Sequence, residues 1–211
     1  MKGWKIIFQA YGQKKKARVT ILITDKIDFK RRAIKRDPEG HFITLQGRIH
    51  QEDINILHIY APNIGASQYI KKILEDFKKD IDSNTIILGD FNTPLSKLDR
   101  SSKQNINKDI VPLNKALNEM DLTDIYTAFH PKEAKYTLFS NAHGTFSNID
   151  HMIGHKASLN KFKKIEIISS IFSDHKGLKL ETNLKENTPK HSKTWRLNSC
   201  LLYTSDAADD C

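Results

Sequence analysis

Residues 85–92 read Thr-Ile-Ile-Leu-Gly-Asp-Phe-Asn, an apolar run that ends in a carboxylate and an amide two positions apart. The first four residues, rich in β-branched side chains, are typical of a buried strand. Gly89-Asp90-Phe91-Asn92 then forms the exit loop of that strand. By itself this string also fits an Asx turn that closes a strand. The stretch therefore predicts a buried strand with polar side chains at its end.

Two later strings repeat the combination, Asn148-Ile149-Asp150-His151 and Ser173-Asp174-His175, the latter soon after the apolar run at 165–168. Metal-assisted phosphodiester cleavage needs acceptors for a hard cation, a base for water and a proton partner. Each string alone is weak evidence, but their joint occurrence indicates one pocket assembled from three strand ends.

The composition is that of one domain with a basic surface. The chain has 211 residues, is 38% hydrophobic, and carries 34 Lys and Arg against 25 acids, for a formal charge of +9. Such a surface favours a polyanionic partner, although a solvated lysine-rich surface is the alternative. The clusters at 14–16 and 161–164 fit either reading. No apolar run reaches membrane-spanning length and no secretory leader is visible, so we expect an intracellular protein, nuclear or cytoplasmic.

The C-terminal segment differs from the rest. Cys200 and Cys211 are the only cysteines, which argues against a disulfide framework or a thiolate zinc site. Residues 200–211 resemble the translation of a sequencing-library adapter; a genuine disordered tail is the alternative. The charge rises from +9 to +12 once the three aspartates of this segment are left out. We expect a domain at 1–183, a polar linker at 184–199 and an artefactual tail at 200–211.

Strand signals alternate with a few helices along the chain. Helical spacing of apolar residues predicts helices over 69–81, with Ser67 as its N-cap, and over 112–120. The strands are expected at 5–10, 19–23, 41–49, 54–60, 85–88, 136–139, 148–153, 165–171 and 177–181. Many strands with interleaved helices argue for α/β architecture with mixed or antiparallel sheets.

At these residues the chain resembles the endonuclease/exonuclease/phosphatase superfamily and, more closely, the endonuclease domain at the N-terminus of LINE retrotransposon proteins. The similarity runs over 3–181 and implies a deoxyribonuclease-like, two-sheet, four-layer α/β sandwich. The residues that carry it are Ile59-Tyr60-Ala61-Pro62-Asn63, Leu88-Gly89-Asp90-Phe91-Asn92-Thr93-Pro94, Leu98-Asp99-Arg100, Phe129-His130-Pro131, Tyr136-Thr137, Ser147-Asn148-Ile149-Asp150-His151 and Ser173-Asp174-His175.

The chain departs from the family pattern at its start. In the family the first strand ends in an asparagine, and a second strand carries the glutamate that is the main metal ligand. Both precede the segment that matches here. We therefore expect a truncated copy whose sandwich lacks its first strand or two and whose cation site has weaker ligands.

The chemistry of the named groups suits phosphodiester hydrolysis. Asp90 at a strand end can orient the attacking water or accept its proton. Asn92, two residues on, can donate its amide to a phosphate oxygen if the chain stays extended. His175 would donate to the phosphate, kept protonated by a carboxylate that the resemblance assigns as Asp150. His151 is expected to be a surface histidine in a loop, and so is His155.

The resemblance implies roles for further residues. Tyr60 would touch the scissile phosphate with its hydroxyl, and Asp174 would help to hold the cation, Mg²⁺ or Mn²⁺. A buried interfacial aromatic and a turn carboxylate are the respective alternatives. DNA-contact positions are expected at Asn63, Arg100, Thr137, Ser147 and Ser173.

These observations lead to one main functional expectation and two alternatives. The first is a divalent-cation-dependent endonuclease that nicks double-stranded DNA and leaves a 3′-hydroxyl to prime retrotransposition, as a monomer. A reverse transcriptase would follow it, as 195–197 (Trp-Arg-Leu) suggest. The second is an inactive truncated copy that retains at most DNA binding. The distant third is a phosphatase of the same superfamily acting on inositol phosphates or sphingolipids, which the basic charge disfavours.

Overall fold

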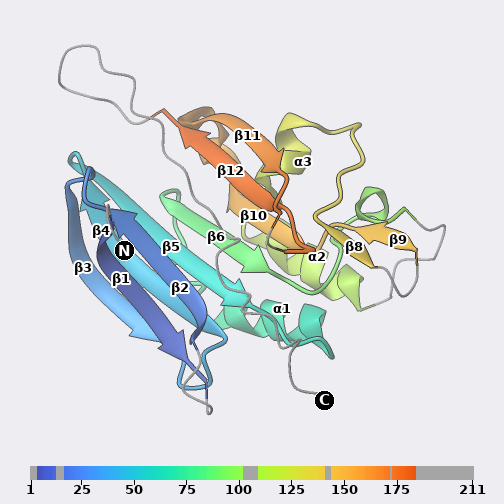
Figure 1. Cartoon of the computed structure of the whole chain (residues 1–211), viewed down its shortest axis with the longest axis horizontal. Coiled ribbons are helices and arrows are strands. Elements are labelled where there is room, and N and C mark those ends of the chain that lie inside the picture. The colour runs from blue at the N-terminus through green and yellow to red at the C-terminus, as the bar shows by residue number, and fades with distance from the viewer. Residues whose placement is uncertain (1–3, 13–16, 102–108, 141–143, 172, 184–211) are drawn as a thin grey trace.

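The computed structural model describes residues 4–12, 17–101, 109–140, 144–171 and 173–183. The expected linker at 184–199, the tail at 200–211 and the lysines at 14–16 therefore lie outside the described residues. Figure 1 shows the arrangement of the elements. The strands are β1 (Trp4–Tyr11), β2 (Ala17–Thr24), β3 (Phe29–Arg36), β4 (Phe42–Ile49), β5 (Glu52–Tyr60), β6 (Thr85–Asp90), β7 (Leu122–Asp124), β8 (Leu138–Ser140), β9 (Thr145–Ser147), β10 (Asp150–His155), β11 (Phe162–Ile168) and β12 (Gly177–Thr182). The helices are α1 (Ala66–Asp76), α2 (Ile110–Glu119) and α3 (Ile125–Phe129), with 3₁₀ turns η1 (Lys97–Asp99) and η2 (Lys156–Lys161).

A six-stranded sheet forms the centre of the molecule, in the order β3-β4-β5-β6-β10-β7. β5 and β6 are parallel because α1 crosses over between them, whereas β3-β4 and β4-β5 are antiparallel hairpins. β10 returns antiparallel to β6. This mixed sheet confirms the expected α/β class.

The two long helices cover one face of this sheet. Ile70, Ile73 and Leu74 of α1 share a buried cluster with Leu113 and Leu117 of α2. From the sheet, Leu57, Ile59, Ile87 and Ile153 join that cluster. The helical periodicity of the sequence therefore predicted the buried face of both helices.

The opposite face carries a second layer made of two separate pairs, β1-β2 and β11-β12 (Figure 1). Phe8, Val19 and Ile21 from the first pair and Ile165 and Leu180 from the second belong to one core, together with sheet residues such as Ile56 and Leu88. The outward side chains Ile7 and Tyr11 are 48% and 50% exposed. The described residues thus build two facing sheet layers, the second of them split in two, with the two long helices on the outer face of the six-stranded sheet.

Several local expectations were wrong. α1 begins at Ala66, three residues before the predicted start, and its N-cap is Gly65 in the left-handed conformation, with φ 74°. Ser67 is instead buried inside the helix and shares a 3.2 Å hydrogen bond with Thr93. β3 was not predicted, because its exposed sequence Lys-Arg-Arg-Ala-Ile-Lys-Arg shows no alternation of apolar residues. Across the described ranges, no helix has the length and apolar character needed to cross a membrane.

Candidate active site

The register of three neighbouring strands places three of the predicted residues in one row. Tyr60 of β5 pairs with Asp90 of β6, and Asp90 pairs with Asp150 of β10. Directly paired residues project on the same face of a sheet, and adjacent strands lie about 4.8 Å apart. The ring of Tyr60 packs against the core between the two layers, which identifies the face. The three side chains therefore lie side by side at one end of the sandwich.

His175 completes the row from a distant part of the chain. Its Nδ1 lies 2.8 Å from the Oδ2 of Asp150. Burial alone would lower the pKa of His175, but the hydrogen bond and the charge of Asp150 outweigh it and raise the pKa to about 9. A histidine held in this way carries a proton at neutral pH, which is the state that the sequence predicted for it.

Asp90 has the complementary property. Burial, followed by the nearby charge of Asp150, raises the pKa of Asp90 to about 6. One of its oxygens accepts the backbone N–H of Asn92 at 2.9 Å. A carboxylate with a pKa close to neutrality is suited to exchange a proton with water.

The ligand atoms of Asp90, Asp150 and His175 all lie within 4.8 Å of one another. Two carboxylates fit a hard divalent cation, which prefers oxygen ligands and often keeps several waters when it binds phosphates. Asp174, which was expected to hold the cation, is exposed and is not a member of this group. The donor set therefore fits Mg²⁺ or Mn²⁺ through Asp90 and Asp150.

Asn92 lies next to this row but its amide is engaged elsewhere. The residue adopts the left-handed conformation, with φ 48°, so the extended geometry assumed from the sequence is wrong. Its Nδ2 donates to the backbone carbonyl of Ala61 at 2.7 Å. In this conformation the Asn92 amide ties the exit of β6 to the exit of β5, and its predicted phosphate contact would require that bond to be exchanged.

The predicted DNA-contact residues divide into two groups. Asn63 is exposed, and Arg100, Ser147 and Ser173 are partly exposed. Isolated antiparallel backbone pairings join Arg100 to Ser147 and Leu138 to His175. The β8-β9 hairpin therefore borders the site. Thr137 is fully buried, and its Oγ1 accepts the backbone N–H groups of Ile149 and Asp150 at 3.2 and 3.3 Å. Its predicted DNA contact is therefore wrong, because burial leaves its hydroxyl to hold the backbone of Asp150.

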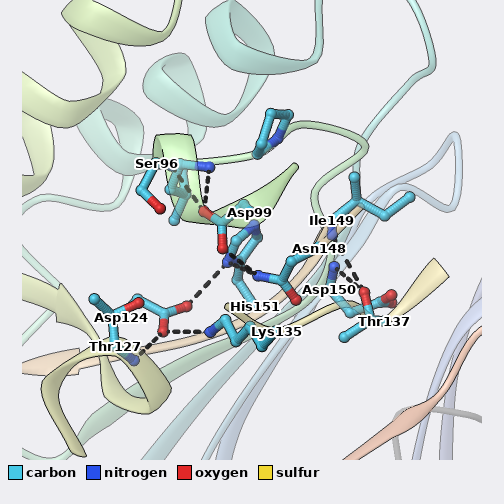
Figure 2. A network of polar contacts seen from close by, with 12 residues as sticks. Ser96, Asp99, Asp124, Thr127, Lys135, Thr137, Asn148, Ile149, Asp150 and His151 are labelled. Carbon is cyan, nitrogen blue, oxygen red and sulfur yellow. Dashed lines mark hydrogen bonds and ion pairs between the residues drawn. The ribbon is translucent and has the colours of Figure 1, made fainter. Parts of the chain in front are cut away.

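Behind the site lies a buried polar network, shown in Figure 2. The Oδ2 of Asp124 lies 2.9 Å from Nδ1 of His151, and its Oδ1 accepts from Lys135 at 2.7 Å. Burial opposes ionisation, but the charges of Lys135 and His151 hold the pKa of Asp124 well below its usual range. Nε2 of His151 faces the carbonyl of Thr93 at 3.1 Å. The expectation of a surface histidine was thus wrong for His151, which is 1% exposed.

A second part of the network joins the loops themselves. Asp99 accepts the backbone N–H groups of Leu95 and Ser96, and its other oxygen accepts from the Asn148 amide at 3.1 Å. Neither Asp99 nor Asp124 was singled out as functional from the sequence. The Asp124–Thr127 cap is a visible helix-start signal, with Asp124 accepting the Thr127 N–H at 2.8 Å. Its link to His151 is not local and has no sequence signal.

Comparison with known proteins identifies the class. Residues 7–175 match the model of the endonuclease/exonuclease/phosphatase family. This match spans most of the chain, and the chain therefore belongs to that family.

Solved structures agree on the fold. The endonuclease domain of TRAS1, a telomere-specific non-LTR retrotransposon, is 14% identical, with a TM-score of 0.69 over 88% of this chain and 83% of that chain. The 3′ phosphatase NExo from Neisseria, bound to a product DNA hairpin, is 18% identical, with a TM-score of 0.68 over 86% and 80%. An AP endonuclease from Archaeoglobus fulgidus is 18% identical, with a TM-score of 0.62 over 83% and 78%. At these identities the likeness establishes the deoxyribonuclease-like sandwich alone.

Proposed function

We propose that this chain is a divalent-cation-dependent endonuclease that hydrolyses a phosphodiester bond in double-stranded DNA. The observation that carries the proposal is the Asp150–His175 pair, at 2.8 Å, in one row with Asp90. The row combines the protonated imidazole of His175 with the carboxylate of Asp90, whose pKa is raised to about 6. Family members are hydrolytic nucleases and phosphatases, which supports a reaction at phosphorus.

In the proposed reaction the residues of the row have separate roles. Asp90 orients a water and takes its proton as the water oxygen attacks phosphorus. His175, held by Asp150, donates a hydrogen bond to a phosphate oxygen as negative charge develops. Tyr60 would contact the same phosphate through its hydroxyl. The bond between phosphorus and the 3′ oxygen breaks, and the leaving oxygen takes a proton from solvent, while Asp90 later returns its proton to solvent. The products are a 3′-hydroxyl and a 5′-phosphate.

A cation held by Asp150, and by Asp90 through an intervening water, would neutralise charge on the phosphate and so assist this displacement, and the second oxygen of Asp90 would stay available as the proton acceptor. Asp90 also remains bound to the Asn92 N–H. The predicted contribution of Asp174 is restricted to its charge, which acts on His175 from an exposed position.

Double-stranded DNA is the proposed substrate because the chain has a formal charge of +9, Asn63 is exposed, and the partly exposed Arg100 pairs with Ser147 of the hairpin that borders the site. The names of structural neighbours support DNA as a ligand of this fold, including a retrotransposon endonuclease domain and a phosphatase bound to a DNA hairpin. We further propose that the nick primes reverse transcription, by a reverse transcriptase in the same polyprotein, and that the domain acts as a monomer.

The decisive test is nicking of supercoiled plasmid in Mg²⁺ or Mn²⁺, followed by polymerase extension from the new end. We expect the parent chain to nick and the ends to be extendable without phosphatase treatment. Asp150→Ala and His175→Ala should lose at least about 100-fold in rate, the scale of general acid–base and electrostatic contributions. His155→Ala, at the other end of β10, is the matched control and should retain the rate. Equal nicking by all four proteins would overturn the assignment.

A binding module without cleavage is the second candidate. It is favoured by one observation: within the described ranges, the group of possible metal ligands holds two aspartates and a histidine but no glutamate. A folded chain that binds duplex DNA in gel shifts, with no nicking at any Mg²⁺ or Mn²⁺ concentration, would support this candidate.

A further inference from the structure

The row of polar side chains continues one strand beyond Tyr60. β4 pairs with β5 so that Phe42 faces Ile59, and the backbone N–H of Tyr60 donates to the carbonyl of His41 at 2.7 Å. His41 therefore stands at the next position of the same row, immediately before β4. The sequence pattern around His41 does not indicate a functional role.

His41 contacts Tyr60 in three ways. Besides the backbone bond, Nδ1 of its ring lies 3.0 Å from the Tyr60 carbonyl and, since a carbonyl only accepts, this nitrogen donates. The two rings stack with an interplanar angle of 5° and centroids 6.2 Å apart. The ring of Tyr69 also packs against the ring of His41, with centroids 5.7 Å apart and an interplanar angle of 58°.

His41 is itself held in place by the turn between β3 and β4. Its backbone N–H donates to the Asp37 carboxylate at 2.8 Å. The carbonyl of Ala61, the residue directly after β5, accepts from the Asn92 amide at 2.7 Å. The carbonyls of Tyr60 and Ala61 are thus each bound by a side chain from a neighbouring strand end. His41 binds from the side of β4, and Asn92 binds from the side of β6.

We propose that His41 is a positioning residue of the active site, which fixes the orientation of Tyr60 beside Asp90 through its ring-to-carbonyl bond and ring stack. The proposal rests on the function proposed above, because the orientation of Tyr60 affects catalysis only if its hydroxyl contacts the phosphate. His41 acts through Tyr60 and not on the phosphate itself. If it served only to close the end of the β4-β5 pair, its loss would lower stability without a specific effect on Tyr60.

The orientation of Tyr60 is tested first, without any need for activity. For this test the full chain is labelled with 3-fluorotyrosine, and the signal of Tyr60 is assigned as the one that disappears in Tyr60→Phe. In ¹⁹F relaxation measurements, His41→Ala should increase the mobility of the Tyr60 ring, and His41→Asn, whose amide can donate to the same carbonyl, should restore much of the rigidity. His50→Ala removes an exposed histidine at the far end of the same strand and should change nothing. A Tyr60 ring equally rigid in His41→Ala would overturn the proposal whether or not the chain nicks DNA.

Kinetics then test the consequence in a double-mutant cycle. On a DNA duplex with Mg²⁺, His41→Ala should lower kcat about 10-fold with KM within about 2-fold, because an interaction made in the transition state is lost. In the Tyr60→Phe background the same substitution should have little further effect. Additive losses would show that His41 does not act through Tyr60. Absence of nicking by the parent would instead refute the proposed function, with the ¹⁹F result still standing.

Discussion

Asp150 and His175 lie 25 positions apart in the chain and meet because β10 begins at Asp150 while the chain returns to the same end of the sandwich just before β12. Their contact converts two ordinary side chains into a pair with a fixed geometry. The environment of each residue, and not its identity alone, sets its proton affinity. Asp90 follows the same rule, but the main cause differs: burial raises the pKa of Asp90, whereas the contact with Asp150 raises the pKa of His175 against the effect of burial.

The first prediction concerns the His175 proton. In metal-free protein, an NMR titration of His175 should show a midpoint near 9. In Asp150→Asn the midpoint should fall by more than about 1 unit, because burial then dominates. Since the folded pKa is raised, this contact stabilises the folded state fully below pH 6.5, and the stabilisation is lost as pH rises through about 9. An unchanged midpoint in the variant would contradict the pairing.

The second prediction concerns Thr137, whose hydroxyl holds the backbone of Ile149 and Asp150. Thr137→Val preserves shape but leaves two buried amides without this acceptor, at a cost of about 1–3 kcal/mol for each unsatisfied group. We expect urea denaturation to show a loss of about 2 kcal/mol or more. Thr137→Ser retains the oxygen and should stay within about 1 kcal/mol of the parent. Equal stability of the Val variant would mean that the hydroxyl has no such role.

At the scale of elements, turns and strand ends decide where the functional groups lie. The two-residue turn between β4 and β5, His50-Gln51, has φ values of 46° and 73°, which are unfavourable for residues with a Cβ. At the opposite end, Gly89 has φ 134°, and a Cβ there would lie 1.9 Å from the carbonyl oxygen of Ile59. Only glycine therefore allows β6 to approach β5 so closely beside Asp90.

The third prediction follows from that turn. Gln51→Gly should raise the free energy of unfolding by about 0.5–1 kcal/mol, because glycine adopts the positive φ without strain. Gln46→Gly, in the middle of β4, should lower it by a similar amount, because glycine there only adds entropy to the unfolded chain. Thermal or urea unfolding measures both. A destabilised Gln51→Gly protein would show that the turn is not under strain.

At the scale of the whole molecule, His58 joins the two layers. It projects from β5 into the core, is 8% exposed, and bonds to the backbone of Thr20 on β2. Burial lowers the pKa of His58 to about 4, against the weaker effect of that bond. In an acidic medium the folded state therefore resists protonation of a group that the unfolded chain protonates readily.

The fourth prediction is an acid-dependent loss of stability from His58. Because its folded pKa is lowered, the unfolded state binds more protons between pH 6.5 and about 4, so stability falls as pH falls through that range. The stability advantage of the parent over His58→Asn should shrink by roughly 3 kcal/mol between pH 7 and 4, at about 1.4 kcal/mol per pKa unit. Parallel stability curves for the two proteins would contradict the assignment. The raised pKa of Asp90 makes the folded state more stable as the pH falls through the same range. This contribution is present in both proteins and therefore cancels in the comparison.

Local patterns were enough to predict the α/β class, both long helices and most strands, because periodicity and turn residues act over a few neighbours. They also indicated Asp90, Asp150 and His175 as polar groups beside strand-like runs, whereas the pairing of Asp150 with His175 was expected from the family resemblance. β3 was missed because the charged and largely exposed residues after Phe29 show no alternation of apolar side chains.

Only the tertiary structure decided how these ends meet. The register of β4, β5, β6 and β10 aligned His41, Tyr60, Asp90 and Asp150, whereas long-range contacts buried His151 and Thr137 and turned the Asn92 amide toward Ala61. Register and burial depend on residues tens of positions away, whose partners no local pattern specifies. The sequence thus determined which groups stand at the strand ends, and the packing of strands determined which of them face one another.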